Sequence, residues 1–250
     1  MNISTKYGKN FVAVLNHLEV ESHKHWLLQF FLSSQKALSV EINNQLISSN
    51  AIIVNGHTAH SVKSNGEPTF TILIDPLSNT GRVLRELLGD KSFYVFCQEK
   101  TNKMQQAFNF ALKQNDYDGY LFFTQNIIQD ISISEIKKMD ERIFRILTLL
   151  EDCEHEDEAH QIKYFSKKIG LSESRLAHLF KKEISIPLKS YIVLHKLQKT
   201  YENILNGENI TTASINAGFD SPSHFAYTNK LMTGMSATNI VKDSEFLKVI

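Results

Sequence analysis

Residues 161–182, QIKYFSKKIGLSESRLAHLFKK, constrain the fold more than any other part of the chain. Apolar residues at helical spacing predict a helix that ends at Gly170, because glycine turns there without a Cβ clash. Ser172 is a typical N-cap for a second helix, whose apolar side includes Leu176 and Phe180. We therefore expect two helices joined by a tight turn, which is the arrangement of a helix-turn-helix.

The same pattern returns at residues 214–221, SINAGFDS, with Gly218 in the turn and Ser221 as the cap. Phe225 then stands where the first copy has its first apolar helix residue. Between the copies, residues 188–205 carry one apolar face and predict a helix of about 27 Å, at 1.5 Å per residue. Because a duplex groove repeats about every 34 Å, a stiff helix of that length can place two reading helices in successive major grooves.

Residues 137–250 resemble the DNA-binding domain of the AraC family of bacterial transcription regulators. The resemblance rests on Gly170-Leu171-Ser172, Leu176, Phe180-Lys181, Tyr191, Lys196-Leu197, Ile210, Ala217-Gly218-Phe219, Phe225, Lys230 and Gly234. It implies double-stranded DNA and RNA polymerase as partners, and side chains on two helices that face bases or phosphates. At those positions the chain has Ser174, Arg175, His178, Lys181, Lys182, Ser223, His224, Tyr227 and Lys230.

The chain departs from the family's pattern at five positions. Lys196 and Tyr227 stand where the family usually has Arg, Ser185 stands for Gly, Asn229 for a core Phe and Ala237 for Pro. An asparagine in a core is costly unless it is hydrogen-bonded, so we expect the first helix to read bases more than the second.

The net charge is zero, yet the charge is unevenly distributed. Residues 163–199 contain nine basic and two acidic side chains, a balance of +7, whereas residues 200–250 contain three basic and five acidic ones, a balance of −2. The first half of the expected DNA-binding domain therefore supplies most of the attraction to phosphate.

Short runs of β-branched and aromatic residues, broken by Asn, Ser and Gly, predict an antiparallel β-barrel in the N-terminal part. The expected strands include Phe11–Val20, Leu27–Ser34, Thr69–Ile74 and Ser92–Phe96, with a hairpin turn at Asn43-Asn44 and a short helix at Thr80–Leu88. The expected fold class is thus α+β, a barrel with flanking helices followed by an all-helical domain.

Residues 10–98 resemble a cupin, the effector-sensing domain often joined to AraC-type readers. The resemblance rests on His23-x-His25, the turn at Asn43-Asn44, and Ile53-Val54-Asn55-Gly56 followed by His60. We expect His23, His25, Trp26 and His60 to border a pocket for a small-molecule effector. The plainer alternative is that the histidines are polar residues at the barrel mouth or on the surface.

Metal cupins have a glutamate about four residues after the His-x-His motif, and here Gln29 or Phe30 takes that place. Glutamine is a poor ligand for a hard divalent ion, so we predict no metal and no cofactor. Three imidazoles are nevertheless a ligand set that zinc or iron accepts.

An amphipathic helix is expected at residues 100–113, and it can either pack on the barrel or form a homodimer interface. A turn and an apolar run follow at residues 115–125, and a helix is expected at residues 132–150 with Ser134 as its N-cap. We predict domains at residues 1–130 and 131–250. The acidic run at residues 151–158 is expected to be a solvated loop.

Two function classes compete with a transcription regulator: a cupin metalloenzyme that uses His23, His25 and His60, and a protein-interaction module. The two cysteines, Cys97 and Cys153, have no metal-ligand spacing and suit a reducing cytosol. No signal-like or membrane-length apolar run is present in the sequence, so we expect a cytoplasmic protein that is not an enzyme.

Overall fold

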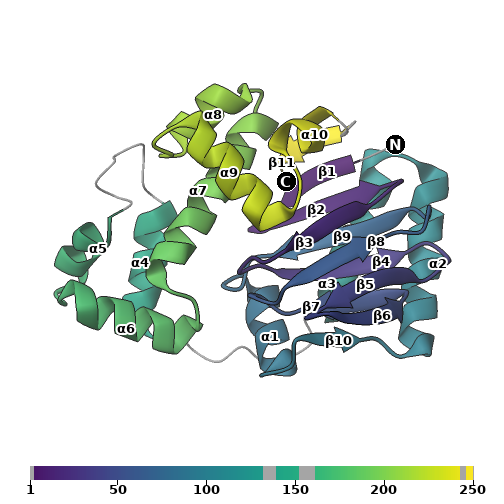
Figure 1. Ribbon diagram of the computed structural model, residues 1–250, viewed down its shortest axis with the longest axis horizontal. Coiled ribbons are helices and arrows are strands. Elements are labelled where there is room, and N and C mark those ends of the chain that lie inside the picture. Colours follow the sequence, from purple (N-terminus) through teal and green to yellow (C-terminus); the bar gives the residue numbers. More distant parts are fainter. Residues whose placement is uncertain (1–2, 132–138, 152–160, 243–245, 250) are drawn as a thin grey trace. The chain divides into compact units, whose positions relative to one another are not determined.

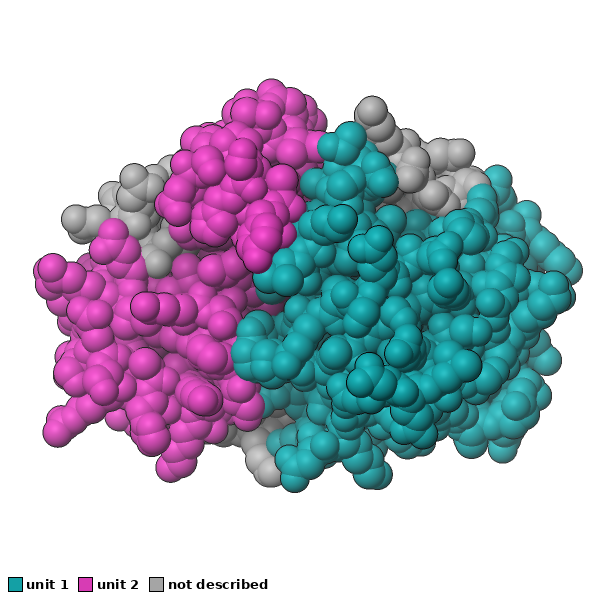
Figure 2. All heavy atoms as spheres, in the orientation of Figure 1, with its two compact units in different colours: residues 1–136, 229–250 teal, residues 137–228 magenta. Residues whose placement is uncertain are grey.

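The computed structural model describes residues 3–131, 139–151, 161–242 and 246–249 (Figure 1). The chain forms two compact units, one of residues 1–136 and 229–250 and the other of residues 137–228 (Figure 2). The division falls within helix α9, Pro222–Thr233. A domain boundary near residue 130 stays a prediction.

The first unit is rich in antiparallel strands, as the sequence predicts. Its strands are β1 (Ile3–Tyr7), β2 (Asn10–Leu15), β3 (Glu19–His23), β4 (Leu28–Ser33), β5 (Leu38–Ile42), β6 (Gln45–Ser49), β7 (Ala51–Val54), β8 (His60–Lys63), β9 (Thr69–Ile74), β10 (Phe93–Val95) and β11 (Phe246–Val249). They form a seven-stranded sheet in the order β10-β7-β4-β9-β2-β1-β11 and a four-stranded sheet in the order β3-β8-β5-β6. The pairing is antiparallel except between β1 and β11, which are parallel.

Strand β4 shows how the layers pack, because its side chains are buried on both faces. Phe30 and Leu32 belong to a core shared with helices α1 (Asn79–Leu88), α2 (Gln98–Gln114) and α3 (Tyr117–Ile131). Phe31 points to the opposite face, where it shares a second core with side chains of the four-stranded sheet. The unit therefore has three layers: helices, the large sheet and the small sheet.

The expected strand at Phe11–Val20 is two strands in the structure, and β1 precedes them. The chain leaves the large sheet after Leu15 and enters the small sheet at Glu19. Leu18 makes this crossing possible because its N–H donates to Ser64 Oγ and its carbonyl accepts from the Ser64 N–H. Because Leu18 and Ser64 are 46 residues apart in the sequence, the local sequence pattern could not predict this contact.

Other N-terminal expectations are confirmed. Asn43 and Asn44 both have positive φ, 49° and 66°, which suits a tight hairpin between β5 and β6. Strand β9 has the predicted bounds, and the predicted short helix is α1. In α2, Met104 and Phe108 lie in the core against the large sheet, whereas Ala107 is exposed. The apolar run after residue 115 forms α3, a helix that the local pattern did not predict.

The helix expected at residues 132–150 begins later than predicted. Helix α4 spans Glu141–Glu151, and Asp140 starts it by accepting the Arg142 N–H at Oδ1 (2.9 Å). The expected cap Ser134 lies outside the described residues, as does most of the acidic run at residues 151–158.

The second unit is helical throughout its described part. After α4 come α5 (Ile162–Ile169), α6 (Glu173–Ile184), α7 (Leu188–Leu205), α8 (Ile210–Asn216) and the start of α9; α10 (Ala237–Lys242) belongs to the first unit. The predicted helix at residues 188–205 is therefore confirmed as α7. No helix in the described ranges combines the length and apolarity that a membrane crossing needs.

Both predicted glycine turns are present and have the same geometry. Gly170 has φ 72° and Gly218 has φ 85°, the left-handed region that favours glycine. The residue after each glycine closes the turn, since the Leu171 N–H donates to Ser166 O and the Phe219 N–H donates to Ser214 O. This is the usual hydrogen-bonded end of a helix that stops at glycine.

Replacement of Ser185 by glycine is expected to stabilise the protein. Ser185 ends α6 in the left-handed region with φ 61°, where a side chain costs about 1–2 kcal/mol. Glycine removes that cost but loses more chain entropy on folding, so we expect a net gain of about 0.5–1 kcal/mol. Urea unfolding measures it, and an unchanged or lower unfolding free energy would contradict the strain.

Gly170→Ala tests the first turn, and here we expect the free energy of unfolding to fall. A Cβ at Gly170 meets nothing within 4 Å, so the cost comes from the positive φ alone, about 1–2 kcal/mol. Gly170→Asn is the matched control, because asparagine tolerates this conformation better. Equal unfolding free energies for the two variants would count against conformational strain.

Candidate functional site

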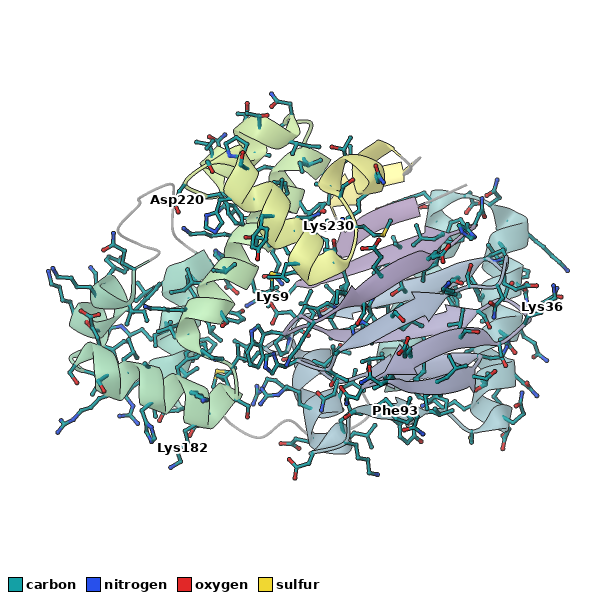
Figure 3. The ribbon with its side chains drawn as sticks, in the orientation of Figure 1. Lys9, Lys36, Phe93, Lys182, Asp220 and Lys230 are labelled. Carbon is teal, nitrogen blue, oxygen red and sulfur yellow. The ribbon has the colours of Figure 1, made fainter. Side chains whose placement is uncertain are left out.

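Helix α6 separates a buried face from an exposed face. Leu176 and Phe180 are fully buried, and Ser172 caps the helix by accepting the Arg175 N–H at its Oγ. The residues that the sequence analysis assigned to the outward face are all exposed; they are Ser174, Arg175, His178, Lys181 and Lys182. Figure 3 labels Lys182, whose side chain extends away from the helix. The helix thus presents hydrogen-bond donors to solvent while its other side fixes its position.

Helix α9 repeats this organisation. Phe225 is fully buried, and Ser221 Oγ accepts the His224 N–H at 3.1 Å. The assigned outward residues are Ser223, His224, Tyr227 and Lys230, and all four are exposed. His224 lies 3.3 Å from the carboxylate of Asp220, which adds negative charge beside this helix. The exposed face of α9 is accordingly less basic than that of α6.

Asn229 is fully buried, in agreement with the core position expected from the family's pattern. Its amide Nδ2 donates to Met235 O at 2.9 Å, and its backbone carbonyl accepts from Thr233 Oγ1. These bonds join the last turn of α9 to the residues that follow it, and they offset the cost of burying an amide.

Lys196 holds the second turn, a role that the sequence analysis did not identify. Its ammonium group donates to the carbonyl of Gly218, so α7 is tied directly to the loop between α8 and α9. Carbonyls at the end of a helix lack partners within the helix, and a cation there satisfies one of them. Lys196 stands where the AraC family usually has arginine, and it still supplies a positively charged hydrogen-bond donor.

The basic charge of this region is accessible. Seven basic side chains between residues 163 and 199 are exposed; they are Lys163, Lys167, Lys168, Arg175, Lys181, Lys182 and Lys189. Lys196 and Lys199 are partly buried on α7. Most of the +7 charge balance is therefore available to a polyanion.

His23, His25 and His60 form a buried cluster in the first unit. His23 on β3 and His60 on β8 are directly opposite each other in the strand register, and His25 follows β3. The ring centroids of His23 and His60 are 4.4 Å apart, and His25 lies 5.1 and 5.2 Å from them. One ring nitrogen from each side chain lies within 4.8 Å of the others. These three expected pocket residues are thus brought together.

Burial keeps the three rings neutral. Burial, with the neighbouring His60 and His23, lowers the pKa of His25 to about 3. Burial and His23 lower the pKa of His60 to about 4, and burial also lowers the pKa of His23. Each ring therefore carries one N–H at neutral pH.

Each ring also has one nitrogen beside a backbone carbonyl. Nδ1 of His23 lies 2.9 Å from Glu21 O, Nδ1 of His25 lies 3.0 Å from Leu27 O, and Nδ1 of His60 lies 2.9 Å from Thr58 O. Because a carbonyl only accepts, each Nδ1 is placed to donate to it. In His25 and His60 the Nε2 atom faces a second acceptor, Gln29 Oε1, so the single N–H of each ring can serve only one of the two oxygens.

Phe30 belongs to the core shared with the helices, whereas Gln29 lies beside this cluster. Its Oε1 lies 3.1 Å from His25 Nε2 and 3.0 Å from His60 Nε2, and its Nε2 donates to Thr71 Oγ1. Trp26 has a different environment, because its ring stacks on exposed His57 at a centroid distance of 3.9 Å. Thr71 comes from a distant strand, so only the fold identifies it as part of this cluster.

Comparison with known proteins adds independent findings. A family model described as a helix-turn-helix domain matches residues 165–243. No curated protein matches the chain.

Solved structures of ToxT from Vibrio cholerae are similar to nearly the whole chain. An apo ToxT variant of strain SCE256 has a TM-score of 0.61 at 12% identity, covering 95% of this chain and 98% of that one. ToxT of strain O395 has a TM-score of 0.59 at 13% identity, covering 96% and 99%. Wild-type ToxT of strain SCE256 bound to an unsaturated fatty acid has a TM-score of 0.58 at 11% identity, covering 94% and 96%. At these identities the likeness establishes the fold alone.

The family match covers both glycine turns and both exposed helices. Residues 165–243 therefore form a helix-turn-helix domain, and the fold of the chain is similar to that of ToxT.

Proposed function

We propose that α6 and α9 enter successive major grooves of a DNA operator. Ser174, Arg175 and His178 of α6 contact base edges, and Lys181 and Lys182 contact phosphates. The observation that supports this assignment best is the sharp division of α6, whose exposed donors lie opposite the fully buried Leu176 and Phe180. Direct readout in the major groove needs hydrogen-bond donors on a helix whose opposite face is held in place by core packing.

Helix α9 is assigned the second half-site, with Ser223, His224, Tyr227 and Lys230 at the DNA. Helix α9 carries less positive charge than α6, which supports the proposal that α6 supplies most of the affinity for DNA. Helix α7, with 18 residues and a length of about 27 Å, is the spacer that keeps the two readers apart.

Arg175→Ala is expected to weaken specific binding by about 1–3 kcal/mol, because an arginine that pairs with guanine contributes that much to discrimination. The change should also relax sequence preference at one base position. Both effects can be measured by gel shift or fluorescence anisotropy, with an operator selected from random duplex DNA and with its single-base variants. Arg145→Ala is the control, since Arg145 is an exposed arginine on α4, outside the helix-turn-helix units. Unchanged affinity and preference in Arg175→Ala would remove Arg175 from the readout.

The double variant Lys181→Ala, Lys182→Ala is expected to weaken binding about equally on all sequences. Each lysine that neutralises a phosphate adds about 1 to the slope of log K against log salt, so removal of both should lower the slope by about 2. A titration series between low and moderate salt gives the slope. A wild-type slope with altered sequence preference would mean that these lysines face bases.

Lys196→Met tests the link between α7 and the second turn. Loss of a hydrogen bond from a charged donor is expected to cost about 1.5–3 kcal/mol of folding stability. Lys196→Arg, the residue usual in the family, should retain most of it, and Lys189→Met is a control for charge loss on the same helix. Equal stability of Lys196→Met and Lys189→Met would contradict the link.

We further propose that a small ligand in the N-terminal unit controls DNA binding. Two features support this: the buried cluster of His23, His25 and His60 between the sheets, and the fatty-acid ligand named for the structurally similar ToxT. Trp26 borders a separate site with His57 in this proposal. RNA polymerase and a second copy of the chain are the protein partners that we propose, with α2 and its exposed Phe110 as the dimer face.

We propose a regulator that acts on DNA in the cytoplasm and not an enzyme. The helix-turn-helix match supports this over a cupin metalloenzyme. So does Gln29, a neutral amide where a metal cupin usually has a carboxylate to serve as ligand.

A further inference from the structure

We propose that helix α9 recognises thymine through apolar contacts with the C5-methyl group, and that Tyr227 is the residue that determines this specificity. The inference rests on the proposed function, because it requires α9 to enter a major groove. It goes further by naming the base that α9 recognises and the chemical group that carries the recognition.

The first observation comes from equivalent positions of α6 and α9, counted from the serine that caps each helix. Ser172 and Ser221 each accept the backbone N–H of the third residue after them. The third, sixth and tenth residues after the caps are Arg175, His178 and Lys182 in α6, and His224, Tyr227 and Leu231 in α9. An aromatic and an aliphatic side chain in α9 thus take the places of a histidine and a lysine in α6.

The second observation is that these side chains of α9 lie open to solvent. Tyr227 is 70% exposed and Leu231 is 54% exposed, and a spacing of four residues puts them on the same side of the helix. Ala226, the residue before Tyr227, is exposed as well. We call these three residues the apolar strip of α9. Exposed apolar side chains that lie next to one another indicate a surface that another molecule covers.

The position of the apolar strip identifies its partner as DNA. The strip lies on the second helix of the second helix-turn-helix unit, within the residues that the family model matches. On the opposite side of α9, Phe225 and Asn229 are fully buried. In a helix-turn-helix, the exposed side of the second helix is the one that lies in the major groove.

The third observation is that α9 has few donors suited to guanine. Guanine presents two acceptors in the major groove, and arginine or lysine is its usual partner. Lys230 is the only lysine or arginine between Pro222 and Thr233. His224 Nδ1 lies 3.3 Å from Asp220 Oδ2, so one of its two ring nitrogens already has a partner.

Thymine is the base whose major-groove edge matches the apolar strip. Among the four bases, it alone presents an apolar group there, the C5-methyl, which packs against side chains such as alanine and phenylalanine. The ring of Tyr227 offers an aromatic surface of the same kind, and Ala226 and Leu231 add smaller apolar surfaces beside it. The chemistry of the strip therefore selects thymine over the other bases.

Tyr227 stands where the AraC family usually has arginine. An arginine in the major groove donates two parallel hydrogen bonds to guanine, whereas a tyrosine ring packs against a methyl group. The departure from the family's pattern is therefore a change of base preference in this proposal, and not the loss of a DNA contact.

The main test changes the DNA and compares the full-length wild type with Tyr227→Ala. An operator selected from random duplex DNA is prepared with uracil in place of each thymine in turn, because uracil pairs in the same way but lacks the methyl group. Burying one such group improves affinity about fourfold. We expect wild-type affinity to fall about fourfold at one or more thymines of a single block, and Tyr227→Ala to be insensitive at those same positions. If no thymine shows a uracil effect that depends on Tyr227, the proposal is wrong.

Further variants define what Tyr227 contributes. Tyr227→Phe should keep the uracil effect, because the ring and not the hydroxyl contacts the methyl group, whereas Tyr227→Arg should move the preference of that position toward guanine. Phe144→Ala is the control, since Phe144 is a 65% exposed aromatic residue on α4, outside both helix-turn-helix units. Loss of the uracil effect in Tyr227→Phe or in Phe144→Ala would contradict the assignment. The wild-type series needs no variant, so a folding defect cannot hide a missing uracil effect.

The outcomes separate this inference from the proposed function. If the wild type selects no sequence from random DNA, the proposed readout of DNA fails as a whole. If it selects an operator that binds equally well with uracil, DNA binding stands and the thymine contact fails. Unchanged operator affinity in Tyr227→Ala would likewise overturn the inference, because the apolar strip would then face a different partner.

Discussion

The helix-turn-helix domain depends on two glycines whose backbone conformation is unfavourable for most other residues. Gly170 and Gly218 have φ of 72° and 85°, and each allows a short helix to end so that the next one starts at once. The buried faces of α6 and α9 then fix the outward faces, because Leu176 and Phe225 occupy equivalent core positions. Arg175 and His224 are exposed because Leu176 and Phe225 on the opposite faces are packed in the core, and not merely because their own side chains are polar.

Local features of the sequence were sufficient to predict the helical part. Glycine turns, serine caps and apolar spacing act over three to five residues, and the turns at Gly170 and Gly218, the caps at Ser172 and Ser221 and the extent of α7 follow from them. What the sequence could not reveal depends on distant contacts. The bond from Lys196 to Gly218 and the hydrogen bonds of buried Asn229 are examples.

In the N-terminal unit, even more of the structure depends on contacts between residues that are distant in the sequence. Its strand content and the turn at Asn43-Asn44 were predictable, but the break between β2 and β3 depends on Leu18 bonding to Ser64 across 46 residues. Likewise, His-x-His and His60 are visible in the sequence, whereas the approach of His25 Nε2 and His60 Nε2 to Gln29 Oε1 requires both sheets. Burial in a low-dielectric interior disfavours the charged form of these rings and keeps them neutral. The roles of the individual DNA-facing side chains stay predictions.

We propose that two linked helices read DNA one groove repeat apart. Selection of bound fragments from random duplex DNA, followed by sequencing, tests it most directly. We expect two short conserved blocks whose centres are about 10–10.5 base pairs apart, with the stronger block assigned to α6. A single conserved block, or two blocks at variable spacing, would contradict it.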